Sequence, residues 1–450
     1  MDWSIIQGRL EQLVASNRHG ELRGALSVLN PVDIAQFMET LDPEKLLMVF
    51  RVLPKDISAD VFSYMSADAQ KVLLNSIGDK QICSIINDMF LDDAVDFLDE
   101  LPSSVVTRVL ANTDAETRNL INHFLDYPEN SAGSIMTIEY MEAHIGMTAG
   151  QTMDEIKRVG FDKETIYTLY VIDDSRHLIG SLALRKLILA RNEDLIDNLM
   201  ETSVISVATT DDQEKVASLV RRYDLMAIPV VDKENRLVGI ITADDIIDVI
   251  QEENTEDFEK MAALTPSEDS YIHTSPFKLA WNRIPWLLLL SIAAIFTGMI
   301  ITNFEDLLQN ASVVLTACIP MLMDTGGNCG AQVSTLIIRG LALNEIQFRD
   351  IFRILWKEFR VGLMVGAVLS AFTLLRVYFI NQAGWTVSIV VALSLYCTVL
   401  MSKVIGCCLP LLAKKLKLDP ALMASPLITT IVDAASLTVY FSIATAILKI

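Results

Sequence analysis

One carboxylate stands in a long apolar stretch near the carboxyl end of the chain. Asp433 is the only charged residue between Ala421 and Leu448. A carboxylate at the centre of a membrane-spanning helix costs about 2.5 to 3.5 kcal/mol, so it normally faces a bundle interior or a watery cavity. On a helix, Thr429, Asp433 and Ser436 share one face, which favours a polar path for a cation. The alternative is that Asp433 is protonated or paired with an intramembrane cation such as Lys403.

A second polar stretch interrupts the apolar sequence at residues 320–332. Gly326 and Gly330 have the spacing that lets two helices approach closely, and close packing alone is one interpretation. Amides beside glycines are also what a hydrated cation path requires, because amides and exposed carbonyls bond the water shell of the ion. The candidate path-lining residues are therefore Gly326, Gly327, Asn328, Gln332 and Thr429.

The third stretch is the most acidic part of the chain. Eight of the sixteen residues from Asp244 to Glu259 are acidic and none is basic. Five of them occupy one face of the expected helix: Asp245, Asp248, Glu252, Glu256 and Glu259. Like charges one turn apart destabilise a helix by a few tenths of a kcal/mol per pair, so the absence of lysine indicates that cations are recruited from solution. A solvated acidic linker is the alternative.

The elements that must position these residues belong to two unlike halves. Residues 1–275 hold 49 acidic and 23 basic residues, whereas residues 276–450 hold 8 and 13, within a total net charge of −21. So acidic a first half argues against nucleic acid or anionic lipid as a partner and favours cations. The six cysteines show no paired metal or disulfide spacing, and the first residues lack the features of a signal peptide, so we expect the first half to stay in the cytoplasm.

Helix-start signals recur at intervals of 11 to 13 residues between about residues 22 and 125. They predict a compact superhelix of short helices. The signals are Pro31, Pro43, Pro54, Ser66, Asp79, Asp92, Pro102 and Asp114. Within this region Asp92 and Asp96 stand one turn apart, with Asp60 upstream, and taken alone they are solvated surface charges.

A unit of roughly 60 residues then appears twice between residues 135 and 253. Each unit has an apolar strand, an Asp-led turn, a second strand that contains Gly180 or Gly239, and a helix. The pattern resembles a tandem cystathionine-beta-synthase (CBS) domain pair. The second unit keeps the Gly239, Thr242 and Asp245 pattern that such domains use for ribose, whereas the first has Ala183 and Lys186 instead, which argues against nucleotide binding there.

The second half reads as five membrane spans of adequate length for about 30 Å of hydrocarbon. They are residues 284–304, 311–338, 361–380, 385–413 and 421–448. Lysine and arginine gather before the first span and between spans two and three and spans four and five, while the other two connections have neither. The positive-inside rule then gives a cytoplasmic amino terminus and an outer carboxyl terminus, and we expect the protein in the plasma (inner) membrane.

The order of these parts, with Gly326-Gly327-Asn328 to Gln332 and Asp419-Pro420 to Asp433, resembles the MgtE family of magnesium channels and transporters over essentially the whole chain. The fold class expected from the resemblance and the patterns together is multidomain. It has a superhelical α-helical domain (1–130), an α/β tandem CBS domain (131–253), an acidic connecting helix (254–283) and an all-α membrane domain with five transmembrane helices (284–450).

The resemblance implies a homodimer that passes hydrated Mg²⁺ beside Asp433 and closes when cytosolic Mg²⁺ binds the acidic domains. The implied Mg²⁺ ligands besides Asp433 are Asp60, Asp92, Asp96, Asp212, Glu214, Asp224, Asp245, Asp248, Glu253, Glu256, Asp257 and Asp419. The alternatives are a CBS-regulated carrier of another divalent cation, Co²⁺, Ni²⁺ or Mn²⁺, or of an anion. The chain has no phosphate-binding loop of an ATPase and no nucleophile and base constellation of an enzyme.

Overall fold

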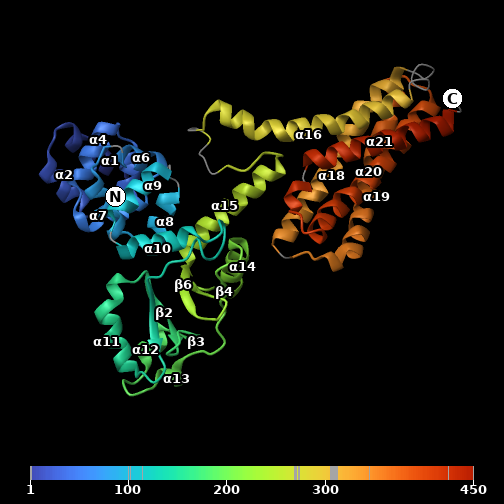
Figure 1. Cartoon of the computed structure of the whole chain (residues 1–450). Coiled ribbons are helices and arrows are strands. Elements are labelled where there is room, and N and C mark those ends of the chain that lie inside the picture. The colour runs from blue at the N-terminus through green and yellow to red at the C-terminus, as the bar shows by residue number, and fades with distance from the viewer. Residues whose placement is uncertain are drawn as a thin grey trace. The chain divides into compact units, whose positions relative to one another are not determined.

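The computed structural model describes the chain except for residues 1–2, 75, 100, 102, 114, 268–270, 272–273, 305–312, 344, 424 and 449–450. The chain forms two compact units, Met1–Ile250 and Gln251–Ile450. Figure 1 labels their helices and strands.

The first part of unit one is a succession of short helices, as the repeated start signals predict. Pro31 and Pro43 each occupy the first turn of a helix, and the Asn30 side chain caps the first of these by accepting a hydrogen bond from the Val32 N–H. The predicted signals Pro102 and Asp114 lie outside the described residues. The helices are α1 (Trp3–Ala15), α2 (His19–Leu26), α3 (Pro31–Glu39), α4 (Pro43–Val52), the 3₁₀ turn η1 (Lys55–Ile57), α5 (Ser58–Ser63), α6 (Ala67–Leu74), α7 (Asp79–Asp88), α8 (Leu91–Asp99), α9 (Ser103–Asn112) and α10 (Ala115–Leu125).

The second part of unit one contains two small mixed sheets, as the repeated 60-residue unit predicts. In each sheet the first pair of strands is parallel and the second pair antiparallel. The first sheet is β1 (Tyr140–His144), β2 (Thr165–Ile172) and β3 (Leu178–Ala183), with α11 (Ala149–Val159), η2 (Gly160–Asp162), α12 (Leu184–Leu189) and α13 (Ile196–Leu199). The second is β4 (Val207–Ala208), β5 (Ala227–Val231) and β6 (Leu237–Thr242), with α14 (Gln213–Tyr223) and the start of α15 (Ala243–Met261).

The two CBS units exchange their opening segments. Met136, which opens the first unit, packs on Gly239 of the second, and Met200, which opens the second, packs on Gly180 of the first. A Cβ atom at Gly239 or Gly180 would lie 2.7 or 2.5 Å from a methionine sulfur, and one at Gly239 would also lie 2.8 Å from the Thr137 carbonyl oxygen, so a larger residue would force these segments to shift. The glycine that ends each repeated pattern is therefore explained by packing between the two units.

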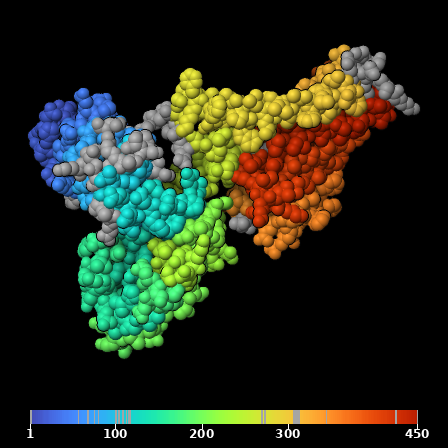
Figure 2. All heavy atoms as spheres, viewed as in Figure 1, coloured from blue at the N-terminus to red at the C-terminus, as the bar shows by residue number. Residues whose placement is uncertain are grey.

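The helical part and the CBS pair share one hydrophobic core. The same buried cluster contains Phe62 and Leu98 of the helices and Ile228, Ile241 and Val249 of the second CBS unit. Figure 2 shows the cyan end of the helical part in contact with the green CBS pair. This packing holds the acidic α8 and the start of α15 in one body.

Within the described residues, unit two contains the end of α15 and five long helices. They are α16 (Pro276–Asn303), α18 (Val313–Ala342), α19 (Ile351–Phe379) preceded by η3 (Phe348–Asp350), α20 (Trp385–Lys415), and α21 (Ser425–Leu448) preceded by η4 (Pro420–Met423). Helix α18 packs against both α20 and α21, α19 packs against α20, and α16 packs against α21. The α18–α21 seam therefore brings together the two polar stretches recognised in the sequence.

Four of the five expected spans are long and apolar enough to cross a membrane: Pro276–Asn303, Phe348–Phe379, Trp385–Lys415 and Pro420–Leu448. Helix α18 is 30 residues long but is not among them. Its middle carries Pro320, Asp324 and the Gly326 to Gln332 stretch, which lower its hydropathy. The expected count of five spans is thus confirmed only for four.

Candidate cation sites

Carboxylates from several elements of unit one form an acidic cluster between the short helices and the CBS pair. We define the acidic cluster as residues that interact electrostatically with one another or with Tyr64: Asp60 of α5, Asp92 and Asp93 of α8, Glu139 and Glu164 beside the first sheet, and Asp244 and Asp245 of α15. The hydrophobic core that the short helices share with the CBS pair holds them together despite their repulsion. Such an arrangement favours cation binding.

Asp92 is the most buried carboxyl of the acidic cluster. Its Oδ1 atom is buried and has no hydrogen-bond partner within the described part of the chain. Burial, followed by repulsion from Asp93 and Asp245, raises the pKa of Asp92 to about 8. An unpaired buried carboxylate oxygen costs free energy, so Asp92 favours either a proton or a bound cation.

Three neighbours share this environment. Burial and then repulsion from Asp245 raise the pKa of Glu164 to about 7 and that of Asp93 to about 6, although Ser63 bonds to Asp93. Burial also raises the pKa of Asp245, which accepts a 2.6 Å hydrogen bond from the Thr242 hydroxyl. Proton affinity is therefore raised at Asp93, Glu164 and Asp245 as well as at Asp92.

The acidic cluster contains three of the predicted ligands, Asp60, Asp92 and Asp245, and four acids that the sequence did not single out. Asp93 and Asp244 adjoin predicted ligands, so their proximity was a usable signal. Glu139 and Glu164 precede strands of the first CBS unit, and only the three-dimensional packing brings them to α8. Asp248, one turn after Asp245 on α15, repels Asp245 electrostatically. Asp96, another predicted ligand, is exposed on α8.

The remaining predicted ligands of the CBS pair lie around α14. Asp212 caps its amino terminus by accepting a 2.9 Å hydrogen bond from the Glu214 N–H. Asp224 ends the helix in a left-handed conformation with φ of 51°. Asp212 and Asp224 stand at opposite ends of an 11-residue helix, about 16 Å long, so this chain does not bring them to one ion.

The end of α15 carries further predicted ligands. Asp257 is half-buried, and burial followed by repulsion from Asp419 raises its pKa to about 6. Lys260, one residue beyond the acidic stretch, lies 2.6 Å from Glu256 and 2.7 Å from Asp419. The interpretation that α15 has no lysine to balance its acids therefore requires correction at this last turn. Glu253 interacts electrostatically with Asp257.

The α18–α21 seam is built on glycine. A Cβ atom at Gly326 would lie 2.9 Å from the Ser436 hydroxyl, and one at Gly327 would lie 2.8 Å from a Thr429 methyl carbon. Both glycines are buried, so in the isolated chain they allow α18 to lie directly on α21. Close packing, one of the two interpretations of this stretch, thus describes their contacts.

The exposed side of α18 is polar. Asp324, Asn328 and Gln332 follow one another at intervals of four residues and are all exposed. Asp324 interacts electrostatically with Asp433 of α21, which is half-buried. The seam therefore places a second carboxylate, missed as a site residue in the sequence, beside Asp433 and in line with two amides.

Lys403 does not pair with Asp433. Its ammonium lies 3.9 Å from Glu358 of α19, and the two side chains are 6% and 16% exposed. A Cβ atom at Gly362, one turn beyond Glu358, would lie 3.4 Å from the stem of Lys403. The alternative interpretation of Asp433 as the partner of Lys403 is therefore wrong for this structure.

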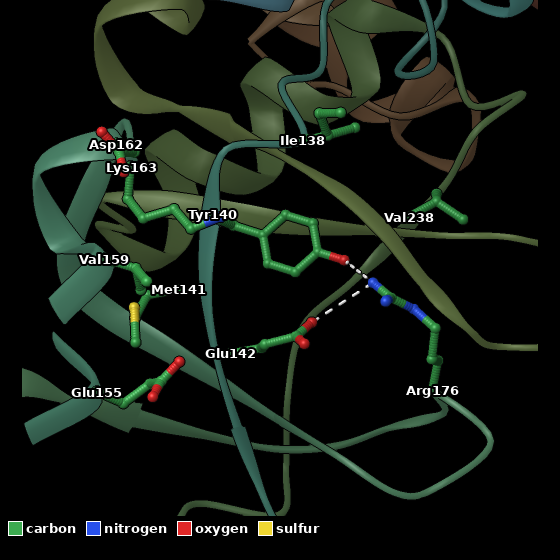
Figure 3. Close-up of a pocket in the computed structure, with 10 residues that line it drawn as sticks. All are labelled: Ile138, Tyr140, Met141, Glu142, Glu155, Val159, Asp162, Lys163, Arg176 and Val238. Atoms are coloured by element: carbon green, nitrogen blue, oxygen red, sulfur yellow. Dashed lines mark hydrogen bonds and ion pairs between the residues drawn. The ribbon is translucent and has the colours of Figure 1, made fainter. Parts of the chain in front are cut away.

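A pocket of about 550 Å³ opens beside the first CBS sheet (Figure 3). Arg176 donates to the Tyr140 hydroxyl and lies 3.4 Å from Glu142, while Glu155, Asp162 and Lys163 line its other end. Thr242 and Asp245 do not line it. Its mixture of three acids and two bases does not match the ribose-binding pattern.

Within the described residues, no three His, Cys, Asp or Glu side chains converge closely enough to hold a metal ion as they stand. Carboxylates without a counter-ion repel one another, so convergence is expected only with a cation between them. Hydrated Mg²⁺ keeps several waters and needs only one or two direct carboxylates.

Comparison with known families matches three segments of the chain. The intracellular N domain of MgtE matches residues 29–130, the CBS domain matches residues 196–252, and the family described as MgtE, divalent cation transporter, matches residues 319–443. The chain is 36% identical over 438 residues to the magnesium transporter MgtE of Bacillus subtilis (strain 168), which covers 97% of this chain and 96% of that protein. The chain belongs to the MgtE family of magnesium transporters. A second MgtE, from Thermus thermophilus, is 36% identical over 431 residues, 95% of each chain.

Two solved structures resemble the cytosolic part. The soluble part of a magnesium transporter aligns with a TM-score of 0.54 and 32% identity, covering 56% of this chain and 99% of that one. The cytosolic domain of the Mg²⁺ channel MgtE in complex with ATP aligns with a TM-score of 0.52 and 34% identity, covering 54% and 99%. This MgtE family member is thus a multi-pass membrane protein with a cytosolic amino-terminal domain and is not an enzyme.

Proposed function

We propose that this MgtE family member conducts hydrated Mg²⁺ into the cytosol beside Asp433 and closes when cytosolic Mg²⁺ binds the acidic cluster. The observation that carries the gating part is the buried, unpaired Oδ1 atom of Asp92 among the carboxylates of Asp93, Asp245 and Glu164. A fold that holds these groups together against their repulsion gains stability from any cation placed between them.

The ion path follows the polar face of the α18–α21 seam. Asp433 and Asp324 attract the cation, and the amides of Asn328 and Gln332 bond its water shell. Mg²⁺ loses its inner waters reluctantly, so carboxylates that grip a hydrated ion suit its passage. Since this polar face is exposed in a single chain, a second copy is needed to enclose it, and we propose a homodimer.

Gating follows from differential affinity. Mg²⁺ binds the compact arrangement of the acidic cluster more tightly than a separated one, so it shifts the population toward the compact, closed state. Loss of Mg²⁺ restores the repulsion and favours opening. Asp60, Asp92 and Asp245 are the predicted ligands that best fit this role, joined by Asp93, Glu139, Glu164 and Asp244.

The other implied ligands lie outside the acidic cluster. Asp96 and Asp248 lie one turn beyond members of the acidic cluster, whereas Asp212, Glu214 and Asp224 cap or flank α14. Glu253, Glu256, Asp257 and Asp419 lie near the junction with the membrane helices, where a lysine already stands between two of them.

We propose that the predicted domains divide the work. Residues 1–130 and 131–253 sense cytosolic Mg²⁺, residues 254–283 transmit the change, and residues 284–450 form the path in the plasma membrane. Helix α18 is the proposed fifth span. Its buried face of Gly326, Gly327 and Gly330 packs within the bundle, so its polar residues need not face lipid.

Nucleotide binding to the first CBS unit is not part of the proposal. Lys186 pairs with Glu201 at 2.7 Å and supplies no carboxylate for a ribose. In the second unit Asp245 is engaged by Thr242 and belongs to the acidic cluster. A related cytosolic domain was solved with ATP, so direct titration of the cytosolic part with ATP is the appropriate check.

Another divalent cation is the second candidate cargo, because the matching family is described as divalent cation transporters. Both are tested by Mg²⁺ uptake in a cell that lacks its own Mg²⁺ transport. We expect uptake by the natural chain, loss in Asp433→Asn at equal membrane levels, and weak competition by Co²⁺ or Ni²⁺. Unchanged uptake in Asp433→Asn contradicts the path, and uptake of Co²⁺ in preference to Mg²⁺ favours the second candidate.

A further inference from the structure

Lys260, in the last turn of α15, is a basic residue among acidic ones. Lys260 lies 2.6 Å from Glu256 one turn earlier on α15 and 2.7 Å from Asp419, which precedes the last helix. Its side chain is only 20% exposed. The ammonium thus lies between two carboxylates, each of which stabilises its charge.

Asp419 is held in a fixed orientation toward this lysine. Its Oδ1 atom accepts a 2.8 Å hydrogen bond from the Ala421 N–H, which leaves Oδ2 for Lys260. The neighbouring Met261 packs against Ile338 and Ala421. The end of α15 is therefore joined to the membrane helices by an ion pair and by an apolar contact.

Hydrogen bonds hold the segment that follows α15 against the end of α15 and against α16. The Ser267 N–H donates to the Glu259 carboxylate at 2.8 Å, and the Thr265 N–H donates to the Asn282 carbonyl at 3.1 Å. These bonds connect α15 to α16. They also supply backbone amides whose protection from solvent reports on this junction.

The residues present do not fit a divalent cation between Glu256 and Asp419. A bound Mg²⁺ requires oxygen ligands at about 2.0 to 2.1 Å in octahedral geometry. The Lys260 ammonium already takes the central position and would repel a second cation there. Asp257 and Glu253 remain beside it, but the ammonium, which acts electrostatically on Asp257, opposes a second cation there as well.

We propose that Lys260 is a tethered cation that takes the place of a bound metal ion between α15 and Asp419, so this junction stays closed when Mg²⁺ is removed. The junction transmits the response of the acidic cluster and does not sense Mg²⁺ itself. This corrects the ligand assignment of Glu256 and Asp419 that the family resemblance implies, and it stands whether or not Asp433 lines the ion path.

Backbone hydrogen exchange of residues 257–267 in the full-length protein, in lipid nanodiscs, tests the proposal. In the natural chain we expect protection that differs by less than about twofold between EDTA and Mg²⁺. Lys260→Gln should exchange about tenfold faster in both conditions, because two partly buried carboxylates lose their shared cation. Lys260→Arg should retain protection, since a guanidinium reaches both partners.

In Lys260→Glu, unlike the natural chain, the protection of residues 257–267 should depend on Mg²⁺. The added carboxylate should make residues 257–267 exchange fast in EDTA and regain protection in Mg²⁺, because the junction then resembles an open metal site. Lys157→Gln, which removes a lysine paired with Asp154 at 3.2 Å on an exposed helix, is the matched control and should behave like the natural chain. Protection of the natural chain by Mg²⁺ alone, or a Lys260→Gln variant as protected as the natural chain, overturns the proposal.

Discussion

At the scale of single residues, Asp92 links the fold to its proposed regulation. Its Oδ1 atom is buried without a partner among the described residues, and Asp93 and Asp245 add repulsion. A carboxyl in this position is stable when it is protonated or bound to a cation. At cytosolic pH these two states compete, which makes Mg²⁺ binding dependent on pH.

The raised pKa values of Asp92, Glu164 and Asp93, about 8, 7 and 6, predict how stability changes with pH. The folded state binds more protons than the unfolded state between about pH 4 and 8, so without Mg²⁺ the cytosolic part loses stability as pH rises through this range. Asp92→Asn should be more stable than the natural chain at about pH 8 without Mg²⁺, by roughly 2 kcal/mol.

Thermal unfolding of a fragment of residues 1–267, comparable to the solved soluble parts of relatives, measures this effect. Mg²⁺ should stabilise the natural fragment more at pH 8 than at pH 6, and Asp92→Asn should lose most of that gain. Asp154→Asn, at an exposed acid on α11, is the control. A natural fragment whose stability rises from pH 6 to 8 in EDTA refutes the assignment.

Asp324 gives a second prediction at this scale. It lies on the polar face of α18 and interacts with Asp433, so its charge should concentrate cations at the seam without being essential for passage. Asp324→Asn should raise the Mg²⁺ concentration for half-maximal flux about fivefold, corresponding to about 1 kcal/mol for one hydrated charge. Thr302→Ala, an exposed hydroxyl on α16 outside the α18–α21 seam, is the control and should leave flux unchanged. Equal concentration dependence in Asp324→Asn and the natural chain shows that the acid faces away from the path.

At the scale of elements, helix packing in unit two depends on small residues and on an ion pair. Gly326 and Gly327 bring α18 onto α21, and Gly362 makes room on α19 for the stem of Lys403 on α20. Glu358, one turn from Gly362, receives the charged end at 3.9 Å. The pair therefore fixes how α19 and α20 lie together.

Removing one member of this pair should be worse than removing both. Lys403→Met leaves Glu358 charged and largely buried, which should cost about 3 kcal/mol of stability, whereas Lys403→Met with Glu358→Gln should recover most of it. Thermal unfolding of the purified membrane protein measures both variants. Additive effects of the two substitutions would show that the side chains do not interact.

The sequence predicted the element types well because each had a local cause. Pro31 and Pro43 start helices, and the Asp-led turns before Gly180 and Gly239 place the CBS strands. The polarity of residues 320–332 explains why the most apolar stretch of α18 is less apolar than those of the other four long helices. Lys260 was missed because it lies one residue beyond the acidic stretch and its partner Asp419 is distant in sequence.

At the scale of the whole molecule, the site could be predicted only in part. Asp60, Asp92 and Asp245 followed from the family resemblance, and their acidic excess was visible in the sequence. Glu139 and Glu164 carry no local signal, since the shared core of the helices and the CBS pair decides which acids meet. The chain thus combines a strongly acidic first half with a membrane half whose last helix contains Asp433.

Electrical recording from membrane patches with stepped cytosolic Mg²⁺ tests the central claim most directly. The natural chain should carry Mg²⁺ current at submillimolar cytosolic Mg²⁺ and close as the concentration rises toward roughly ten millimolar, a range expected of open carboxylate sites that retain water. Asp92→Asn should stay open over this range, Asp154→Asn should close like the natural chain, and Asp433→Asn should carry no current. A natural chain that never closes, or an Asp92→Asn variant that closes at the natural concentration, would contradict gating through the acidic cluster.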